Sequence, residues 1–419
     1  MDKIRSLTGM PDLYDDGDMN NMPSKLFEIE RRIKNIFINF SFQEIRTPIL
    51  EDANLFKRSV GSSSDIVNKE IYSFNDRNDK TIAMRPEGTA SVIRSIVEKK
   101  LDHSTHKLWY MGPMWRYERP QKGRYRQFNQ AGIEILGVQE GLAEFEMISV
   151  VCSIIQEFEI KNCLIKINHL GTQQDKEAFC KALVNFLEPY KKELNEKDVE
   201  RLRKNPLRIL DSKNTETQNL LKKAPSIKDF IDKSAMNLLN SIKKQFSDIC
   251  DIEIDHSLVR GLDYYSGIVF EAFDKTFDIG ALVGGGRYDN LPSVFGRNDL
   301  GATGVAGGVE RIMLALENQN STFKIQDDRI SVLYVNEEMK SNAIKIASLL
   351  RENSIPTDID LSGRALKKQM EQSTNYKFVI IVGPDEFSKN VVVVRNMSDR
   401  TENLSPSFIN PIAIPATGS

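Results

Sequence analysis

The stretch RYERPQKGRYRQFNQAGIEILG, residues 116–137, connects two segments of strand-like composition through a turn rich in cations. Residues 108–118 and 124–137 favour extended strands, and the RPQKG between them contains the proline and glycine that favour turns. The sequence therefore predicts a long antiparallel hairpin, with the second strand leading into a helix over residues 142–160.

The hairpin has one polar face. Side chains alternate between the two faces of a strand, so the second strand places on one face Arg124, Arg126, Phe128, Gln130, Gly132 and Glu134. On the first strand, Arg116 and Glu118 share a face. The opposite face becomes apolar toward its end, as expected of a face that packs on core helices. Because Gly132 has no side chain, we expect another group to approach the sheet closely there.

The polar face suits a nucleotide. An arginine fork matches a phosphate, a phenylalanine can stack on a planar base, and a carboxylate can accept an N–H or offset an ammonium group. These residues predict a site with a nucleotide at one end and a small polar or cationic molecule at the other. On the hairpin alone, a solvent-exposed, salt-bridged ribbon fits equally well.

Three later segments add polar groups to this picture. RGLDYYSG, residues 260–267, places Arg260 and Asp263 beside two tyrosines in an apolar, strand-like region, where buried charges require partners. GALVGGGRYDNL, residues 280–291, allows close backbone approach and lacks the GK[ST] of a P-loop. GVERIMLAL places Arg311 at the start of a helix, where it and Arg116 would clamp a triphosphate.

The rest of the chain predicts an α+β organisation. The sequence predicts an amphipathic helix over residues 23–40, an edge strand around Pro48, and a strand, turn and helix from residue 81 with Thr89 or Ser91 as its cap. Residues 171–250 are helix-rich and predict an inserted helical subdomain. After a polar linker at 318–329, strands alternate with helices, which favours a small α/β domain with a largely parallel sheet.

Composition narrows the function classes. The 419 residues are 40% hydrophobic and 28% charged, and the net charge is -2, so any nucleic-acid partner must be held by local basic patches. No apolar run is long enough for a membrane span, and the N-terminus lacks a signal-peptide core; we expect no membrane association and a cytoplasmic location. The four cysteines and four histidines are scattered, so we expect reduced thiols and no protein-held metal site.

The motifs occur in an order that resembles one family. MRPEGTA, the hairpin, RGLDYYSG, GGGRYDNL and GVERI are similar to the histidyl-tRNA synthetases, which are class II aminoacyl-tRNA synthetases. RGLDYY is the most specific of these. EIRTPILE, which contains Pro48, resembles the first class motif at the dimer interface, and residues 363–383 resemble the family's anticodon-binding domain.

The resemblance implies a fold and a reaction. The implied fold is a mostly antiparallel catalytic sheet flanked by helices over residues 1–325, with the helical insertion at about 171–250, and an α/β anticodon-binding domain over 326–419. The implied protein is a homodimer that binds L-histidine, ATP, Mg²⁺ and tRNA(His). Histidine and ATP would form histidyl-adenylate and pyrophosphate, and the histidyl group would then pass to the 3′-terminal adenosine.

For histidine, the resemblance implies that Glu87 holds the α-ammonium group, with Thr89 nearby. It also implies that the amino-acid site is lined by Gln130, Glu134, Tyr264 and Tyr265, with Tyr265 near the imidazole.

For ATP, the resemblance implies that Arg116 grips the α-phosphate and Arg311 the γ-phosphate. Glu118 would meet the adenine side, Phe128 would stack on the base, and Arg124 would join the ATP set. Arg260 would stabilise the α-phosphate where related enzymes rely on a metal ion, so Arg260 and Arg116 are the implied catalytic residues. This assignment requires Arg116, Arg260 and Glu134 to converge on one cavity.

Two alternatives remain beside the ligase. A non-catalytic relative, a regulatory subunit of histidine biosynthesis, shares the fold and would be expected to lose the clamping arginines and the C-terminal domain; this chain has both. A ligase for another cationic amino acid is disfavoured by RGLDYY. Where the family commonly has Asp-Ala-Glu after the hairpin, this chain has GLAEFEMIS, which leaves the roles of Glu144 and Glu146 open.

Overall fold

The computed structural model describes residues 4–14, 22–61, 66–121, 123–297, 300–319 and 329–406. They divide into two units, one with the described residues up to 319 and one with residues 329–406. Most of the linker predicted at 318–329, and the end of the chain from residue 407, lie outside the described residues.

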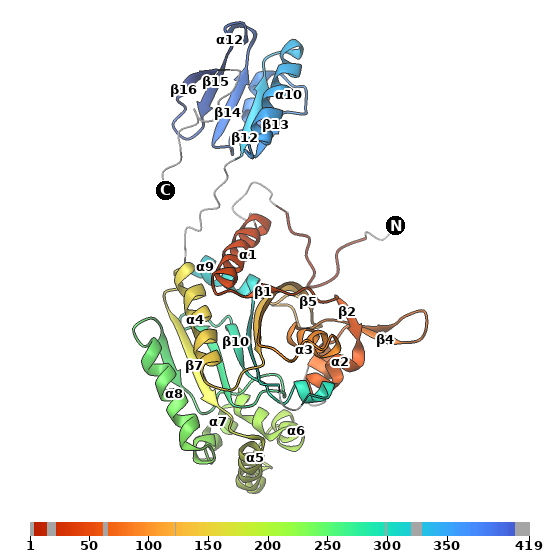
Figure 1. Ribbon diagram of the computed structural model, residues 1–419, viewed down its shortest axis with the longest axis vertical. Helices are drawn as coiled ribbons and strands as arrows, with labels where there is room; N and C mark the ends of the chain where they lie inside the picture. Colours follow the sequence, from red (N-terminus) through yellow and green to blue (C-terminus); the bar gives the residue numbers. More distant parts are fainter. Residues whose placement is uncertain are drawn as a thin grey trace. The chain divides into compact units, whose positions relative to one another are not determined.

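An eight-stranded sheet forms the centre of the larger unit (Figure 1), in the order β1-β5-β6-β11-β10-β9-β7-β8. The strands are β1 (Gln43–Glu44), β5 (His106–Trp115), β6 (Gln127–Leu136), β7 (Cys163–His169), β8 (Asp251–Ile254), β9 (Ile268–Asp274), β10 (Ala281–Arg287) and β11 (Ala302–Gly308). β1 pairs with β5 and β7 with β8 in parallel, and the other neighbours are antiparallel. The predicted mostly antiparallel sheet is confirmed.

The predicted hairpin is β5–β6, paired from His106 with Leu136 to Trp115 with Gln127. The strands stop there, and the alternation predicted for Arg126 does not hold, although Arg124 lines one cavity together with Phe128 and Gln130. Arg126 instead places its guanidinium 3.7 Å from the centre of the Tyr117 ring. The prediction failed for Arg126 because the backbone pairing becomes irregular there: the Arg116 N–H donates to the Arg126 carbonyl at 2.9 Å, but the Arg126 N–H donates to the carbonyl of Gly9 at 2.7 Å and not to the first strand.

Helices cover one face of the sheet with apolar side chains. α1 (Met22–Asn39) and α9 (Val309–Asn318) pack on the apolar face of β6, which includes Ile133 and Ile135, and α4 (Leu142–Glu157) packs on β10 and β11. The helix predicted over residues 23–40 is thus confirmed, since its three- and four-residue spacing is the stripe that is buried.

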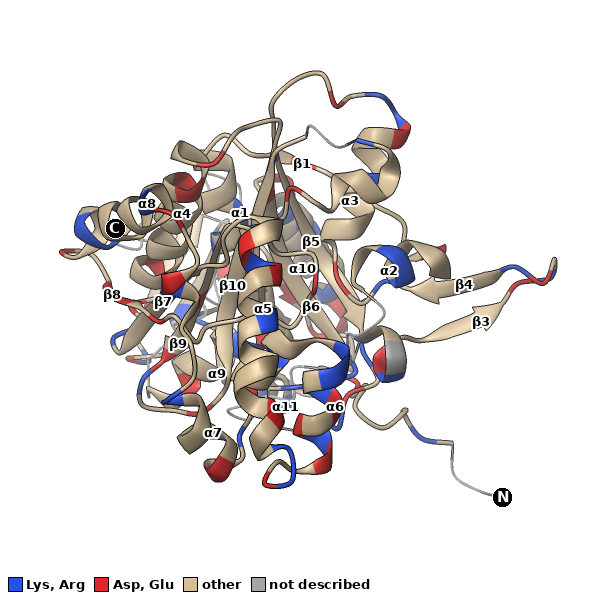
Figure 2. Cartoon of the chain, turned by 90° about the horizontal axis from the view of Figure 1, so that it is seen from below, with Lys and Arg blue, Asp and Glu red and all other residues tan. Residues whose placement is uncertain are grey.

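A small sheet follows α1 and β1. It contains β2 (Leu50–Asp52), β4 (Thr81–Met84) and β3 (Ser73–Asn75) in that order, and it is accompanied by α2 (Ala53–Ser59), a π-helical turn (Ile66–Glu70) and α3 (Thr89–Glu98). Figure 2 shows β3 and β4 extending from the body of the unit, with charged residues at their turn. Pro48 lies between two short strands, β1 at the edge of the large sheet and β2, where no ladder requires its missing N–H.

The cap of α3 differs from the prediction of Thr89 or Ser91. The helix begins at Thr89, and the Glu87 carboxylate accepts hydrogen bonds from the backbone N–H groups of Thr89 at 2.6 Å and Ala90 at 2.9 Å. A carboxylate is well placed here, because the first turn of a helix presents unpaired N–H groups and a partial positive charge.

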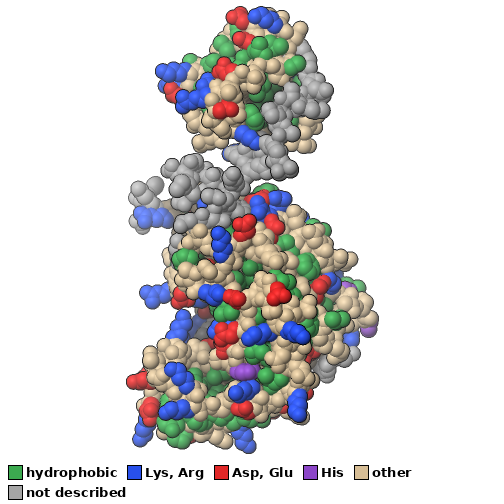
Figure 3. Space-filling view, turned by 90° about the vertical axis from the view of Figure 1, so that its left-hand side faces the viewer, with side chains coloured by type: hydrophobic (Ala, Val, Ile, Leu, Met, Phe, Trp, Pro, Cys, Tyr) green, Lys and Arg blue, Asp and Glu red, His purple; other side chains and the backbone are tan. Residues whose placement is uncertain are grey.

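The helical insertion lies between β7 and β8. It consists of α5 (Gln173–Leu187), α6 (Glu196–Lys204), α7 (Thr215–Leu221) and α8 (Lys233–Phe246), with the 3₁₀ turns Glu188–Tyr190, Pro206–Asp211 and Ile227–Asp229. Figure 2 shows charged residues of both signs along α5 and α6. Positive and negative side chains are likewise mixed on the face of the molecule shown in Figure 3.

The smaller unit has a five-stranded sheet in the order β13-β12-β14-β15-β16. Its elements are β12 (Ile330–Tyr334), α10 (Glu337–Glu352), β13 (Thr357–Ile359), α11 (Leu366–Gln372), β14 (Phe378–Val382), α12 (Pro384–Phe387), β15 (Val391–Asn396) and β16 (Glu402–Pro406). β12 is parallel to β13 and β14, but β15 and β16 are antiparallel. The sheet is less parallel than predicted, because the connection from β14 to β15 is too short for a crossover.

Candidate active site

Four arginines from three segments of the chain line one cavity of about 470 Å³ in the larger unit. They are Arg116, Arg124, Arg260 and Arg311. The cavity is also lined by Phe128 and Gln130 of β6 and by residues of β10 and β11. Burial, together with the positive charges of Arg124 and Arg116, lowers the pKa of Arg311 to about 10. A cavity that weakens the protonation of its own arginine is suited to a polyanion.

Backbone carbonyls hold two of these guanidinium groups. Arg116 Nε donates to the carbonyl of Pro86 at 2.8 Å, and Arg311 Nη1 donates to that of Ala281 at 2.6 Å. Arg116 also lies 5.2 Å from the centre of the Phe128 ring. Because a carbonyl fixes a guanidinium without neutralising it, much of the positive charge remains available to a ligand.

Glu118 partly offsets the cations at the hairpin turn. Its carboxylate lies 3.3 Å from Arg124 Nη1 and 3.8 Å from Arg116 Nη1, and it lines the same cavity. The nucleotide residues suggested by the hairpin are therefore gathered around one space.

Arg260 comes from a loop rather than from the predicted strand-like region. Residues 255–267 lie outside the strands, between β8 and β9, and Arg260 forms an ion pair with Glu271 of β9. Its guanidinium lies over Gly284 of β10, where an added Cβ would be 2.2 Å from Nη1. Its Nε is buried with no hydrogen-bond partner in the part of the chain that the structure describes. The glycine leaves the floor of the cavity flat for this side chain, as predicted for residues 280–291.

A second set of predicted residues is buried beside the cavity. Glu87, Thr89, Glu134, Tyr264 and Tyr265 are all buried and do not line the cavity itself. The expectation that Arg116, Arg260 and Glu134 would open on one cavity is therefore met for the two arginines and not for Glu134. The reason is packing of the aromatic rings: the ring centres of Tyr264 and Tyr265 are 4.7 Å apart, and Tyr288 lies edge-on to both.

Gln130 connects two compartments: the arginine-lined cavity and the buried compartment beside it. Its side chain lines the cavity, and its amide oxygen accepts a hydrogen bond from the backbone N–H of Gly88 at 3.2 Å. Arg260 lies 5.5 Å from the centre of the Tyr265 ring, which joins the compartments on their other side.

Glu134 is the centre of the buried compartment. It is 1% exposed and accepts hydrogen bonds from Thr89 Oγ1 at 2.7 Å and from the Tyr288 hydroxyl. Burial, above all, raises its pKa to about 8. Gly304 on the neighbouring strand leaves room for this carboxyl, since an added Cβ would lie 1.7 Å from Glu134 Oε2. An acidic group in such surroundings is suited to an N–H donor or a cation.

Sequence reasoning missed two tyrosines of this compartment. Tyr288 lies within the quoted GGGRYDNL but received no role. Tyr110 pairs across the hairpin with Gly132, and its ring occupies the space predicted there for a close approach, 2.4 Å from where a Cβ would be. The alternation of side chains along the first strand could have indicated Tyr110, because it places Tyr110 on the same face as Arg116.

Glu144 and Glu146, whose roles the sequence left open, belong to separate ion pairs. Glu144 is 0% exposed and accepts from Arg287 Nε at 2.9 Å and from the backbone N–H of Gly141 at 2.6 Å. Glu146 pairs with Lys107. Glu144 thereby holds Arg287, the residue that precedes Tyr288.

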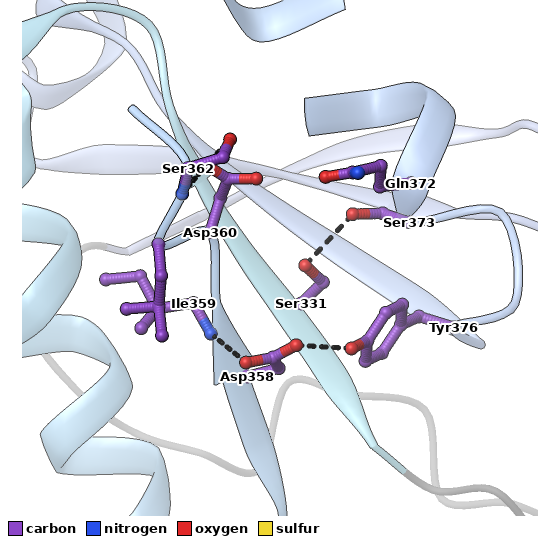
Figure 4. A pocket seen from close by; sticks show the side chains of 9 residues that line it. Ser331, Asp358, Ile359, Asp360, Ser362, Gln372, Ser373 and Tyr376 are labelled. Carbon is purple, nitrogen blue, oxygen red and sulfur yellow. Dashed lines mark hydrogen bonds between the residues drawn. The ribbon is translucent and has the colours of Figure 1, made fainter. Parts of the chain in front are cut away.

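The smaller unit contains a separate cavity of about 420 Å³ between β13 and α11. Figure 4 shows that its polar groups bond to one another: Tyr376 donates to Asp358, and Ser331 pairs with Ser373 at 3.1 Å. Within the described ranges, no group of three His, Cys, Asp or Glu side chains is arranged to hold a metal, and no helix is long and apolar enough to cross a membrane.

Comparison with known proteins identifies the family. The family model of the histidyl-tRNA synthetases matches residues 21–312, and that of the anticodon binding domain matches residues 329–408. This chain belongs to the histidyl-tRNA synthetase family.

Relatives in this family are similar over nearly the whole chain. The histidine–tRNA ligase of Francisella philomiragia is 38% identical over 92% of this chain and 95% of its own length. That of Oceanobacillus iheyensis is 40% identical over 88% of each chain. The solved apo histidyl-tRNA synthetase of S. aureus is 31% identical, with a TM-score of 0.77 over 96% of this chain and 97% of its own.

Proposed function

We propose that this protein ligates L-histidine to tRNA(His) through a histidyl-adenylate formed from ATP. One arrangement supports the proposal most directly: a cavity lined by four arginines adjoins a buried acidic, tyrosine-rich compartment, and Gln130 bounds both. The first compartment suits the triphosphate and the second suits an amino acid with an imidazole side chain.

The first step needs no protein nucleophile. The histidine carboxylate attacks the α-phosphorus of ATP, the bond to the β-phosphate oxygen breaks, and pyrophosphate leaves. Catalysis then consists of alignment and charge stabilisation. Arg116 and Arg260, the proposed catalytic residues, would hold the α-phosphate, and Arg311 would hold the γ-phosphate.

Adenine would lie at the hairpin end of the cavity. Phe128 offers a ring for stacking, Glu118 an acceptor for the exocyclic amine, and Arg124 a further cation. Because Arg116 already lies against the Phe128 ring, we expect adenine binding to rearrange these two side chains.

Mg²⁺ would accompany ATP and would supply positive charge that stabilises the departing phosphates. Such an ion requires only one or two protein carboxylates beside the phosphates. Glu271, which lines the cavity beside Arg260, would fit that requirement. At the α-phosphate, Arg260 would supply the positive charge.

Histidine would be recognised by hydrogen bonds in the buried compartment. Glu87 would accept the α-ammonium group, with Thr89 and Gln130 beside it, and Glu134 would meet an imidazole nitrogen between Tyr264 and Tyr265. Isosteres without that nitrogen would leave this one hydrogen bond of Glu134 unmade, at a cost of ~1–3 kcal/mol. The tyrosine rings must separate to admit the ligand, because they now pack against one another.

In the second step the histidyl group passes to the 3′-terminal adenosine of tRNA(His). We assign catalysis to residues 1–325, with the insertion at about 171–250, and anticodon binding to residues 326–419. The active form would be a cytoplasmic homodimer, with the segment around Pro48 at its interface.

A regulatory subunit of histidine biosynthesis is the alternative. A solved protein described as an ATP phosphoribosyltransferase regulatory subunit/histidyl-tRNA synthetase from Bacillus halodurans is 22% identical, with a TM-score of 0.65, a likeness of fold alone. The three arginines that such a relative would be expected to lose are here gathered around one cavity.

Pyrophosphate exchange into ATP, measured with each standard amino acid in turn, tests the proposal. Exchange with histidine alone supports it. Exchange with another amino acid would refute the specificity, and no exchange with any of them would favour the regulatory alternative.

A further inference from the structure

The helical insertion contacts the loop that carries Arg260 and the two pocket tyrosines. In Figure 1 the insertion helices α5, α6 and α7 lie together at the end of the larger unit remote from α1. Three of its side chains hydrogen-bond to residues 260–265. The insertion is therefore a neighbour of the adenylation site and not only a separate appendage.

Each of the three hydrogen bonds reaches a different part of the loop. Arg208 Nη1 donates to the carbonyl of Arg260 at 3.3 Å. Asn205 Nδ2 donates to Asp263 Oδ1 at 2.7 Å. Lys176 Nζ donates to the carbonyl of Tyr265 at 2.8 Å.

The loop is held from its other side as well. The backbone N–H of Asp263 donates to the carbonyl of Val60 at 3.3 Å, and a Cβ added to Gly61 would lie 2.5 Å from Asp263 Oδ2. Asp263 is thus enclosed between the end of α2 and the insertion, and Asn205 supplies the insertion's side of that enclosure.

The insertion and the pocket tyrosines also share a hydrophobic core. Tyr264, Tyr265 and Tyr288 belong to the same cluster of buried residues as Phe179, Leu183, Leu202 and Leu207 of the insertion. A displacement of the insertion would therefore be felt by the rings that form the proposed histidine site.

A buried aspartate holds the segment that reaches the cavity. Asp198 accepts hydrogen bonds from Asn195 Nδ2 at 2.7 Å, Thr217 Oγ1 at 2.8 Å and Ser212 Oγ at 2.5 Å. Lys213 lies in the chain between Ser212 and Thr217. Together with Asp211, it lines the cavity that contains the four arginines.

From these contacts we infer that the helical insertion is part of the adenylation site: Lys176, Asn205 and Arg208 are positioning residues that hold the 260–265 loop for the first step. The inference rests on the proposed function and deepens it. It places the insertion in a reaction that needs no tRNA. Lys213 adds a cation to the lining of the cavity that we assign to the triphosphate.

The physical reason is alignment. Two of the hydrogen bonds are to backbone carbonyls of the loop, so they set the path of the chain and, through it, the directions of Arg260 and Tyr265. Because charge stabilisation of a reacting phosphate depends on placement, an error near 1 Å can cost about 100-fold in rate.

Histidine-dependent ATP–pyrophosphate exchange, without tRNA, tests the inference on the full-length protein. Asn205→Ala and Lys176→Ala should lower the exchange kcat by about 10- to 100-fold, with a smaller change in KM for ATP. Asn219→Ala is the matched control, because Asn219 is exposed on α7 and bonds only to Lys222 among the contacts that the described structure contains. It should exchange like the unmodified protein.

A donor–acceptor swap separates positioning from general destabilisation. Asn205→Asp opposes two carboxylates and should lower exchange further than Asn205→Ala. Combining it with Asp263→Asn exchanges the roles of the two side chains and should raise exchange at least about 2-fold above that of Asn205→Asp alone, on the coupling expected for contacting residues. Thermal unfolding of each variant shows whether it is folded at the assay temperature.

The outcomes are distinct. If the unmodified protein shows no histidine-dependent exchange, the proposed function fails. If it exchanges and the single variants exchange equally well, this inference fails. It also fails if the variants lose only tRNA charging, or if the swap recovers nothing. Loss of exchange with recovery by the swap supports it.

Discussion

Tyr288 directly follows β10, and its hydroxyl donates a hydrogen bond to Glu134 of β6. Strand β11 lies between β6 and β10 in the sheet. Thr89 Oγ1 donates to the other oxygen of the same carboxyl, at 2.7 Å. Two hydroxyl groups from distant parts of the chain therefore orient one buried acid in the proposed histidine site.

Glu134→Gln should weaken histidine binding far more than ATP binding. The amide keeps the shape but replaces one acceptor oxygen by a donor, so KM for histidine should rise by roughly 5- to 150-fold, from a cost of ~1–3 kcal/mol. Exchange kinetics at saturating ATP, and then at saturating histidine, measure the two constants. Equal weakening of both would remove Glu134 from the amino-acid site.

The same carboxyl predicts a pH dependence of stability. Its pKa of about 8 lies above the ordinary 4.5, so the folded chain holds this proton more tightly than the unfolded chain does. This contribution is fully present below pH 4.5 and is lost as the pH rises toward about 8; each pKa unit corresponds to about 1.4 kcal/mol. The free energy of unfolding, measured with denaturant across this pH range, should fall less steeply with pH for Glu134→Gln than for the unmodified protein. The same pH dependence in both proteins would contradict the prediction. Some pH dependence remains in both, because the pKa of Glu310 is also raised, to about 7.

Arg260→Ala should abolish histidine-dependent exchange while leaving the fold intact. The side chain supplies charge at the proposed α-phosphate position, and removal of one such group costs about 100-fold or more in rate. Arg31→Ala, on the exposed side of α1, is the control and should retain exchange. Near-normal exchange by Arg260→Ala would refute its assigned role.

Gly284→Ala should reproduce part of the Arg260 defect without altering the arginine. A Cβ at this position would lie 2.2 Å from Arg260 Nη1, so the guanidinium must move away from its place over β10. We expect exchange to fall by about 10-fold or more, in line with the cost of misplacing a catalytic group. Exchange equal to that of the unmodified protein would show that the position of this guanidinium over β10 is not needed.

Deletion of residues 326–419 should spare adenylate formation and impair tRNA charging. The proposed ATP and histidine residues lie in the larger unit, and the smaller unit has its own hydrophobic core around β12 and α10. Exchange and charging assays on the same preparation distinguish the two steps. A truncated protein that charges tRNA normally would show that this domain does not contribute to tRNA recognition.

The sequence determined the local elements wherever a repeating pattern was strong. The three- and four-residue spacing of Leu26, Ile29 and Ile33 specified α1, and the turn at RPQKG between two strand-like runs specified the β5–β6 hairpin. Motif order was sufficient to indicate the family. These features depend on neighbours along the chain, which is why the sequence displays them.

Only the tertiary structure decided which distant groups meet. Tyr110 occupies the space above Gly132, Glu144 pairs with Arg287, and Asn205 of the insertion bonds to Asp263. The tertiary structure also showed that Glu134 lies behind the arginine cavity and not on its wall. Burial and pairing of this kind depend on how strands and helices pack in space, and no periodicity within a single element records that.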